Sequence, residues 1–284
     1  MSKYIIVAET GADIPAEIVN KYGIRIVPMH VSFGTETKDD MTFPVSDIFD
    51  YYHKTGTLPK TAGSTPGDFE IVFDEIHEQY PDKHILHLAY SAITTCSYQS
   101  AVIAADGLDY ITSIDTKCVS AGQAFLVLTV AEWLEKNPDA PLDVVIEMVN
   151  DLINRIHMGF IPGDLVYLKA GGRVSNAAYM GAKILNLSPV IEIVDGKLMS
   201  AKKYRGSIMT SGIKLIKEFS ETHHLMKDRA IFVYSGDMNP ALKEKAENTA
   251  KECGFESCMW IQAGCVVSTH SGPGAFGIIG FSEK

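Results

Sequence analysis

Residues 4–23, YIIVAETGADIPAEIVNKYG, contain a complete strand, turn and helix. The apolar run from Tyr4 to Ala8 predicts a short buried strand. We interpret Asp13 as the N-cap of the helix, with Pro15 in its first turn and Gly23 at its end. A buried strand followed directly by a helix is typical of α/β proteins with parallel sheets.

The same alternation of strand and helix continues outward through the first half of the chain. We expect further strands at residues 24–33, 84–90 and 110–114. We expect helices at residues 46–54, from residue 65, at 97–105 and at 121–135. This order predicts a mainly parallel sheet with helices on both of its faces.

The second half of the chain has a different pattern. We expect strands at residues 164–169, 190–194, 197–203, 230–234 and 257–261, and helices at 144–156 and 240–253. Asp195-Gly196 joins two of these strands and is a hairpin signal. We therefore predict two α/β domains: residues 1–160 with a mainly parallel, three-layer arrangement, and residues 161–284 with a mixed or antiparallel sheet and helices.

Composition excludes several classes of protein. The chain has 284 residues, of which 46% are hydrophobic, so it has enough apolar surface for a real core. Its net charge of −10 gives no general attraction for nucleic acid. Five cysteines without a C-x-x-C pair, and no secretory signal at the start, lead us to expect a cytoplasmic protein. No apolar stretch approaches the ~18 residues of a membrane span, so we expect no stable membrane insertion.

No nucleotide or metal motif survives inspection, and we expect no cofactor. Residues 272–277, GPGAFG, match the dinucleotide pattern G-x-G-x-x-G. That pattern requires a following helix and an acidic residue ~20 positions later, whereas only seven residues follow here.

Four polar segments remain as candidates for a ligand site: residues 60–66, 91–98, 170–175 and 268–274. Their hydroxyl groups, glycines, one arginine and one histidine would suit an anion. Each segment also has a plainer interpretation: helix caps at 64–65, a tight turn at 171–172 and a structural histidine at 270. The stretch from Lys169 to Arg205 has seven basic and two acidic residues, a local charge of +5 that favours an anionic ligand or an acidic partner.

These segments resemble the DegV family, the fatty-acid-binding proteins that serve as lipid-carrying subunits of bacterial fatty acid kinase. The most specific matches are YLKAGGRVS (residues 167–175), LNLSPVIEIVDGKL (185–198) and THSGPGAFG (269–277). GADIP, TAGSTPGDF, SYQSA and SIDTKCVSAGQ support them, so the resemblance covers the whole chain. It implies a two-domain α/β protein that holds one long-chain fatty acid, with the carboxylate near the domain junction and the tail in an apolar tunnel of the second domain.

The resemblance also implies which residues hold the carboxylate. They are Thr61, Thr95, Arg173 and His270, and Arg205 is a candidate contact with the kinase. The chain departs from the family at Glu9-Thr10-Gly11, where DST is usual, and in its TAGST and TTCSY segments. At the latter, Thr95 keeps the hydroxyl of the usual serine, and Cys96 replaces a glycine and is expected to narrow the site.

We therefore expect a binding subunit that presents a fatty-acid carboxylate to a separate ATP-dependent kinase for acyl-phosphate formation. Candidates for the tail wall are apolar residues of 158–194, including Met180, Ile184 and Leu187. The alternative is an acyl hydrolase or acyltransferase that uses a serine or threonine with His270 as base. A DNA-associated regulator is disfavoured by the net charge and by the lack of a helix-turn-helix signature.

Overall fold

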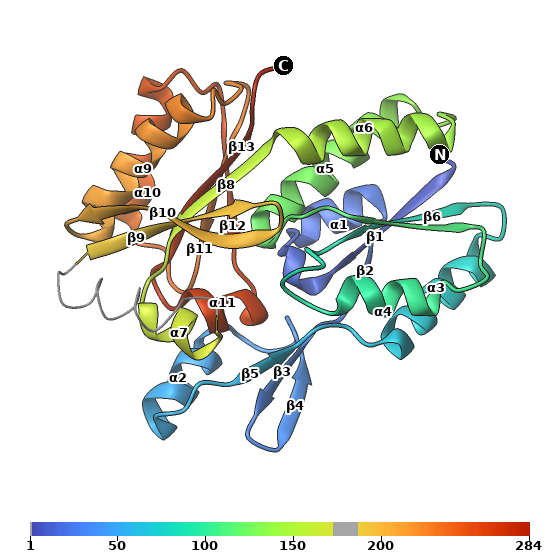
Figure 1. Ribbon diagram of the computed structural model, residues 1–284, viewed down its shortest axis with the longest axis horizontal. Helices are drawn as coiled ribbons and strands as arrows, with labels where there is room; N and C mark the ends of the chain where they lie inside the picture. Colours follow the sequence, from blue (N-terminus) through green and yellow to red (C-terminus); the bar gives the residue numbers. More distant parts are fainter. Residues whose placement is uncertain (1, 173–186) are drawn as a thin grey trace.

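The computed structural model describes residues 2–172 and 187–284 and begins with a fully parallel sheet. This sheet has four strands in the order β2-β1-β6-β7 (Figure 1). The strands are β1 (Tyr4–Glu9), β2 (Arg25–Val27), β6 (His84–Ala89) and β7 (Ile111–Asp115). The parallel sheet predicted for the first half is confirmed.

Helices cover both faces of this sheet, and alternate residues of β1 are therefore buried on opposite sides. Ile6 packs in a cluster with α1, α5 and α6, whereas Val7 packs with α3 and α4. These helices are α1 (Ala16–Tyr22), α3 (Pro66–Gln79), α4 (Ser97–Ala104), α5 (Ser120–Lys136) and α6 (Leu142–Arg155). Burial on both faces explains why the strand is continuously apolar.

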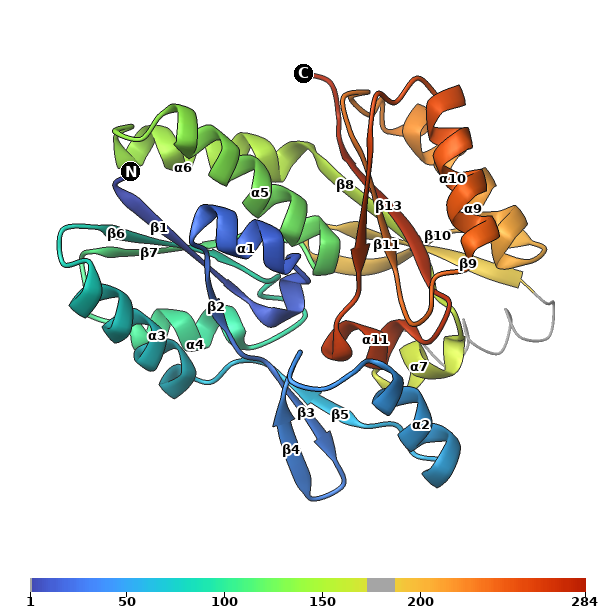
Figure 2. The same cartoon turned by 180° about the vertical axis from the view of Figure 1, so that it is seen from behind.

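The second sheet is mixed and has six strands in the order β10-β9-β8-β13-β11-β12. Among the described strands of this sheet, only β11 and β12 pair in parallel. The strands are β8 (Ile156–Ile161), β9 (Leu187–Val194), β10 (Lys197–Arg205), β11 (Ala230–Tyr234), β12 (Cys258–Gln262) and β13 (Phe276–Phe281). Its outer face is covered by α9 (Ile208–Thr222) and α10 (Pro240–Glu252) (Figure 2). The mixed sheet is as predicted, and the domain division at residue 160 stays a prediction.

Helix α5 lies between the two large sheets (Figure 1). It is buried on almost every side, and one apolar cluster joins its Phe125 and Leu126 to Ile6 of β1 and Ile279 of β13. A helix that is hydrophobic all round belongs inside a protein. The two halves of the chain therefore share one core. No helix among the described residues has the length and apolar character of a membrane span.

A small antiparallel sheet lies below the other two and completes the junction (Figure 2). It consists of β3 (His30–Phe33), β4 (Glu36–Asp39) and β5 (Lys60–Ala62). Its apolar side packs with α2 (Ser46–Thr55), α7 (Leu165–Ala170) and α11 (Cys265–Ser271). This packing brings segments from both ends of the chain together.

Three local predictions are wrong for identifiable reasons. Residues 24–33 form two strands in different sheets, with Pro28 between them. Residues 164–169 form helix α7, because the Asp164 side chain accepts a hydrogen bond from the Val166 amide and caps it. Asp13 is not a helix N-cap: it follows the 3-10 turn η1 (Thr10–Ala12) in a left-handed conformation, and Pro15 precedes α1.

Candidate functional site

A cavity of about 320 Å³ lies where the three sheets meet. Its wall is mainly apolar and includes Met158 and Phe160 of β8, Leu168 of α7, Val233 of β11 and Phe276 of β13. Its polar wall contains three of the predicted site residues, namely Thr61, Thr95 and His270. Its volume falls within the range of about 300–1,000 Å³ that is usual for ligand sites.

Thr61 and His270 are in direct contact although 209 residues separate them. Thr61 lies on β5, opposite Val31 of β3, and its Oγ1 is 2.8 Å from Nε2 of His270 on α11. With the imidazole proton on Nε2, His270 donates to the threonine oxygen, and the hydroxyl hydrogen of Thr61 can then be donated to another acceptor. An acceptor in the cavity, such as a carboxylate, would be suitably placed for that hydrogen.

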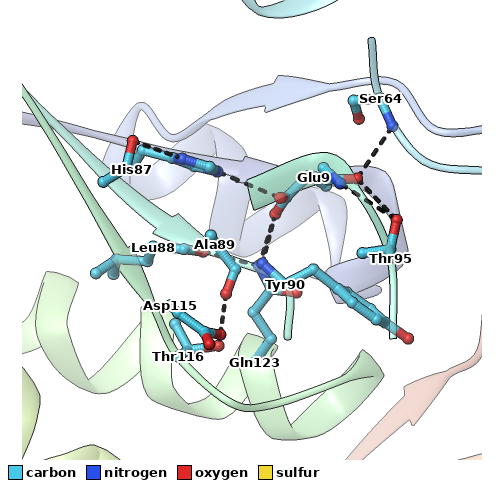
Figure 3. Close-up of polar contacts among 12 residues, drawn as sticks. Glu9, Ser64, His87, Leu88, Ala89, Tyr90, Thr95, Asp115, Thr116 and Gln123 are labelled. Atoms are coloured by element: carbon cyan, nitrogen blue, oxygen red, sulfur yellow. Dashed lines mark hydrogen bonds and ion pairs between the residues drawn. The ribbon is translucent and has the colours of Figure 1, made fainter. Parts of the chain in front are cut away.

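Thr95 lies just before α4 and belongs to a second pair of hydroxyl groups at the polar wall of the cavity. Its Oγ1 lies 3.2 Å from Oγ of Ser97, which in turn accepts a hydrogen bond from the Ser64 amide at 3.0 Å. Dashed lines in Figure 3 mark these contacts between the Ser64 amide and Thr95. A Cβ at Gly63 would lie only 2.2 Å from the Thr95 oxygen, so a glycine is required at residue 63 for this close approach.

Cys96 does not distort this loop. It is exposed, borders the cavity and has a φ of −81°, a value that any residue adopts. Because the backbone at residue 96 is not left-handed, this chain does not require the glycine that is usual at this position in the family.

The other predicted residues either lie outside the described part of the chain or do not line this cavity. Arg173 lies outside the described residues, as do Met180 and Ile184 among the tail-wall candidates. Arg205 is exposed at the end of β10 and does not line the cavity, and neither does Leu187. Gly171 does reach the site: a Cβ at this residue would lie 2.1 Å from Nδ1 of His270. A side chain at residue 171 would displace the imidazole.

The glycines of residues 272–277 do not build a nucleotide site. Gly272 and Gly274 have positive φ values, and the motif leads into strand β13 rather than into a helix. Most of the fourth polar segment, residues 268–274, belongs to helix α11. This helix gives His270 a rigid support.

Glu9 forms a buried polar network beside the cavity that sequence reasoning missed (Figure 3). It accepts hydrogen bonds from the Tyr90 amide at 3.0 Å and from Nε2 of Gln123 at 2.9 Å, and its other oxygen lies 3.3 Å from Nε2 of His87. Burial acts to raise the pKa of Glu9, but the charge and hydrogen bond of His87, with those of Gln123 and Tyr90, bring it below its ordinary value. Tyr90 lines the cavity, so the network fixes part of the wall. The one signal in the sequence was a charged residue at the end of an apolar strand.

Glu9→Gln is expected to destabilise the protein in a pH-dependent manner. Because the pKa of Glu9 is lowered by folding, its contribution is present above the unfolded value of about 4.3 and is lost as the pH falls through the folded value. Urea unfolding at pH 7 should show the variant about 1.5–3 kcal/mol less stable, and at pH 3 the difference should shrink. Glu17→Gln, an exposed carboxylate on α1, is the control. An equal difference at both pH values would contradict the assignment.

A second cavity, of about 340 Å³, lies on the other side of Met158. Charged and imidazole side chains make its wall more polar, among them Lys117, His157, Glu192 and His223. The rings of His157 and His223 stack at 4.3 Å, and burial lowers the pKa of His157 to about 4. None of the predicted site residues that the structure describes, namely Thr61, Thr95, Arg205 and His270, lines this cavity.

Comparisons with known proteins agree with this fold. Residues 3–283 match the family model described as "Uncharacterised protein, DegV family". A DegV domain-containing protein of Caldanaerobacter subterraneus subsp. tengcongensis is 28% identical over 288 residues, covering 100% of both chains. One from Streptococcus pyogenes serotype M3 is 30% identical over 234 residues, covering 79% of this chain and 78% of the relative.

Solved structures give the same result. One described as "Fatty Acid Binding of a DegV family Protein from Thermus thermophilus" superposes with a TM-score of 0.87 at 28% identity and covers 99% of both chains. A structure of DegV from Bacillus subtilis, described as a fatty acid binding protein, has a TM-score of 0.82 at 23% identity, covering 99% of this chain and 100% of that one, and shows the shared fold alone. Since the family model spans nearly the whole sequence, this chain belongs to the DegV family.

Proposed function

We propose that this protein binds one long-chain fatty acid, with its carboxylate at Thr61, Thr95 and His270 and its tail in the 320 Å³ cavity. The observation that carries the proposal is the 2.8 Å contact of Thr61 with His270 in the wall of a mainly apolar cavity. The Thermus thermophilus relative, whose structure is described by its fatty acid binding, supports it.

The energetics of the cavity fit an acid with a long tail. Burial of a ~16-carbon chain at about 0.8 kcal/mol per methylene contributes on the order of 11 kcal/mol. A buried carboxylate without partners would cost several kcal/mol of that gain. Two threonine hydroxyls and an imidazole offset this cost, and Arg173 is proposed as the positive charge, although it lies outside the described residues.

Denaturing mass spectrometry of an organic extract tests this binding directly. Purified protein should release close to one long-chain fatty acid per chain, and its mass will give the length and saturation of the tail. Protein that has been stripped of lipid by a hydrophobic resin should give an extract without the fatty acid. Incubation of this stripped protein with the fatty acid should restore the signal. Failure to bind after reloading would overturn the proposal.

The finer part of the proposal is that the protein presents this carboxylate to a separate fatty acid kinase in the cytoplasm. A carboxylate oxygen attacks the γ-phosphorus of ATP, the bond to the bridging oxygen breaks, and ADP leaves while the acyl phosphate remains. This protein supplies the oriented carboxylate, and the partner supplies ATP. The exposed Arg205 at the end of β10, which also carries Lys202 and Lys203, is the proposed contact with the kinase.

Arg205→Glu is expected to reduce acyl-phosphate formation by at least about tenfold, because a reversed surface charge slows electrostatically steered association. Acyl phosphate is trapped with hydroxylamine and measured as the hydroxamate, using a purified fatty acid kinase catalytic subunit. Fatty acid content should not change, since Arg205 does not line the cavity. Lys251→Glu, which reverses the charge of an exposed lysine on helix α10, is the matched control. Equal rates for both variants would remove Arg205 from the interface.

The purified protein can also be tested for the alternative function, that of an acyl hydrolase or acyltransferase. A carrier releases no burst of alcohol from an activated ester such as 4-nitrophenyl palmitate. A burst that His270→Ala abolishes would favour the covalent mechanism instead.

A further inference from the structure

The first turn of helix α11 is held by two buried carboxylates from the opposite end of the chain. Asp13 Oδ1 accepts a hydrogen bond from the Gly264 amide at 2.8 Å. Asp40 Oδ1 accepts from the amides of Cys265 at 3.0 Å and Val266 at 3.2 Å. Each aspartate is only 2% exposed. These are the backbone amides at the start of the helix, which have no partner within the helix itself.

Both carboxylates are themselves fixed to elements that form the cavity. The second oxygen of Asp13 accepts a hydrogen bond from the hydroxyl of Ser120, which begins α5 and lines the cavity. Asp13 and Ser120 have φ values of 57° and 49°, in the left-handed region. Non-glycine residues keep such conformations only where their surroundings impose them.

Asp40 connects α11 to the sheet that carries Thr61. It follows directly after β4, and its amide donates to the Met29 carbonyl at 2.8 Å. Strand β3 pairs with β4 on one side and with β5 on the other, where Val31 lies opposite Thr61. The small sheet and the residue that follows it therefore contact helix α11 twice. Asp40 binds the first turn of the helix, and Thr61 contacts His270 near the end of the helix.

We infer that Asp13 and Asp40 are positioning residues for carboxylate recognition: they fix helix α11 so that His270 meets Thr61 at the cavity wall. This inference rests on the proposed function. His270 is the sixth residue of α11, about 8 Å along the axis from its start, so a small tilt at the first turn moves the imidazole away from Thr61. Neither aspartate lines the cavity, and both would act through the helix.

Comparison of a fatty acid with the alcohol of the same length tests this role. Asp40→Ala should weaken binding of hexadecanoic acid about tenfold more than binding of hexadecan-1-ol, because a displaced His270 affects only the headgroup. Asp40→Asn keeps the oxygen acceptor and should restore the preference for the acid. The control is Asn239→Ala, which removes a similar cap from α10 away from the cavity and should leave the ratio of the two affinities unchanged.

If Asp40→Ala does not fold, Gly264→Ala provides a second test, because this variant keeps both carboxylates. A Cβ at Gly264 would lie 2.9 Å from Asp13 Oδ1, so Gly264→Ala shifts the first turn of α11 without deleting a cap. It should produce the same selective loss for the acid. In a His270→Ala background, Asp40→Ala or Gly264→Ala should affect acid and alcohol equally.

The outcomes separate the two proposals. If the wild-type protein has no preference for the acid, the proposed function fails. If the wild type prefers the acid but Asp40→Ala and Gly264→Ala weaken both ligands equally, only the positioning role is overturned. Persistence of the selective loss in the His270→Ala background would also overturn it.

Discussion

His270→Ala is expected to lower the affinity for hexadecanoic acid by about 10- to 100-fold, the effect of losing a hydrogen bond to a charged group. The imidazole orients the Thr61 hydroxyl across 2.8 Å, so its removal leaves the carboxylate without the aligned Thr61 donor. Affinity for hexadecan-1-ol should change by less than about twofold, because the tail cavity is intact. Isothermal titration calorimetry of lipid-free protein measures both values.

Thr61→Ala should reproduce most of this loss, and the double variant should lose little more, because the two side chains act as one unit. His53→Ala on α2 is the matched control, since His53 is exposed and does not line the cavity. Equal losses for acid and alcohol in His270→Ala would show that His270 shapes the cavity rather than the headgroup site.

Phe125→Ala is expected to reduce the free energy of unfolding by about 3–5 kcal/mol, the cost of a large cavity in a core. Phe125 of α5 packs on Phe281 of β13 with ring centroids 4.6 Å apart, within the cluster that also contains Ile6 of β1. Because this cluster joins both large sheets, the variant should still unfold in a single transition, monitored by fluorescence and circular dichroism in urea.

Ile71→Ala is the control for that experiment, since Ile71 is 61% exposed on α3 and its truncation should change stability by less than about 0.5 kcal/mol. Two separated transitions in Phe125→Ala would contradict a shared core and would instead indicate halves that unfold independently.

Local sequence signals predicted most of the regular elements, because their causes are local. Thr65 and Asp68 exchange the hydrogen bonds of a capping box at the start of α3, as their spacing indicates. Gly23 ends α1 with a φ of 64°, and Asp195-Gly196 forms the β9–β10 turn with both residues at positive φ. In each case the residue type favours this backbone conformation locally.

The remaining errors arise where distant contacts decide. Asp13 has the residue type and spacing of an N-cap, but its carboxylate instead binds the Gly264 amide, 251 residues away. The apolar run at 164–169 suits a strand or a short helix equally, and packing of Tyr167 between Phe49 and Tyr52 accompanies the helix.

In the candidate site, too, local features could be predicted and long-range contacts could not. The sequence contained the residue types for binding an anion, but not the pairing of Thr61 with His270, which depends on the small sheet and α11. The supporting groups Glu9, Gln123 and Asp40 could not be predicted, because their hydrogen bonds span 78 to 225 positions of the chain, whereas sequence patterns report only on near neighbours.

The most direct test of the central claim is NMR of hexadecanoic acid labelled with ¹³C at the carboxyl carbon. We predict one narrow bound carboxyl resonance at one equivalent of ligand, distinct from that of free acid and shifted by Thr61→Ala and by His270→Ala but not by His53→Ala. A bound resonance that is the same in all of these proteins would show that the carboxylate lies elsewhere and would contradict the account.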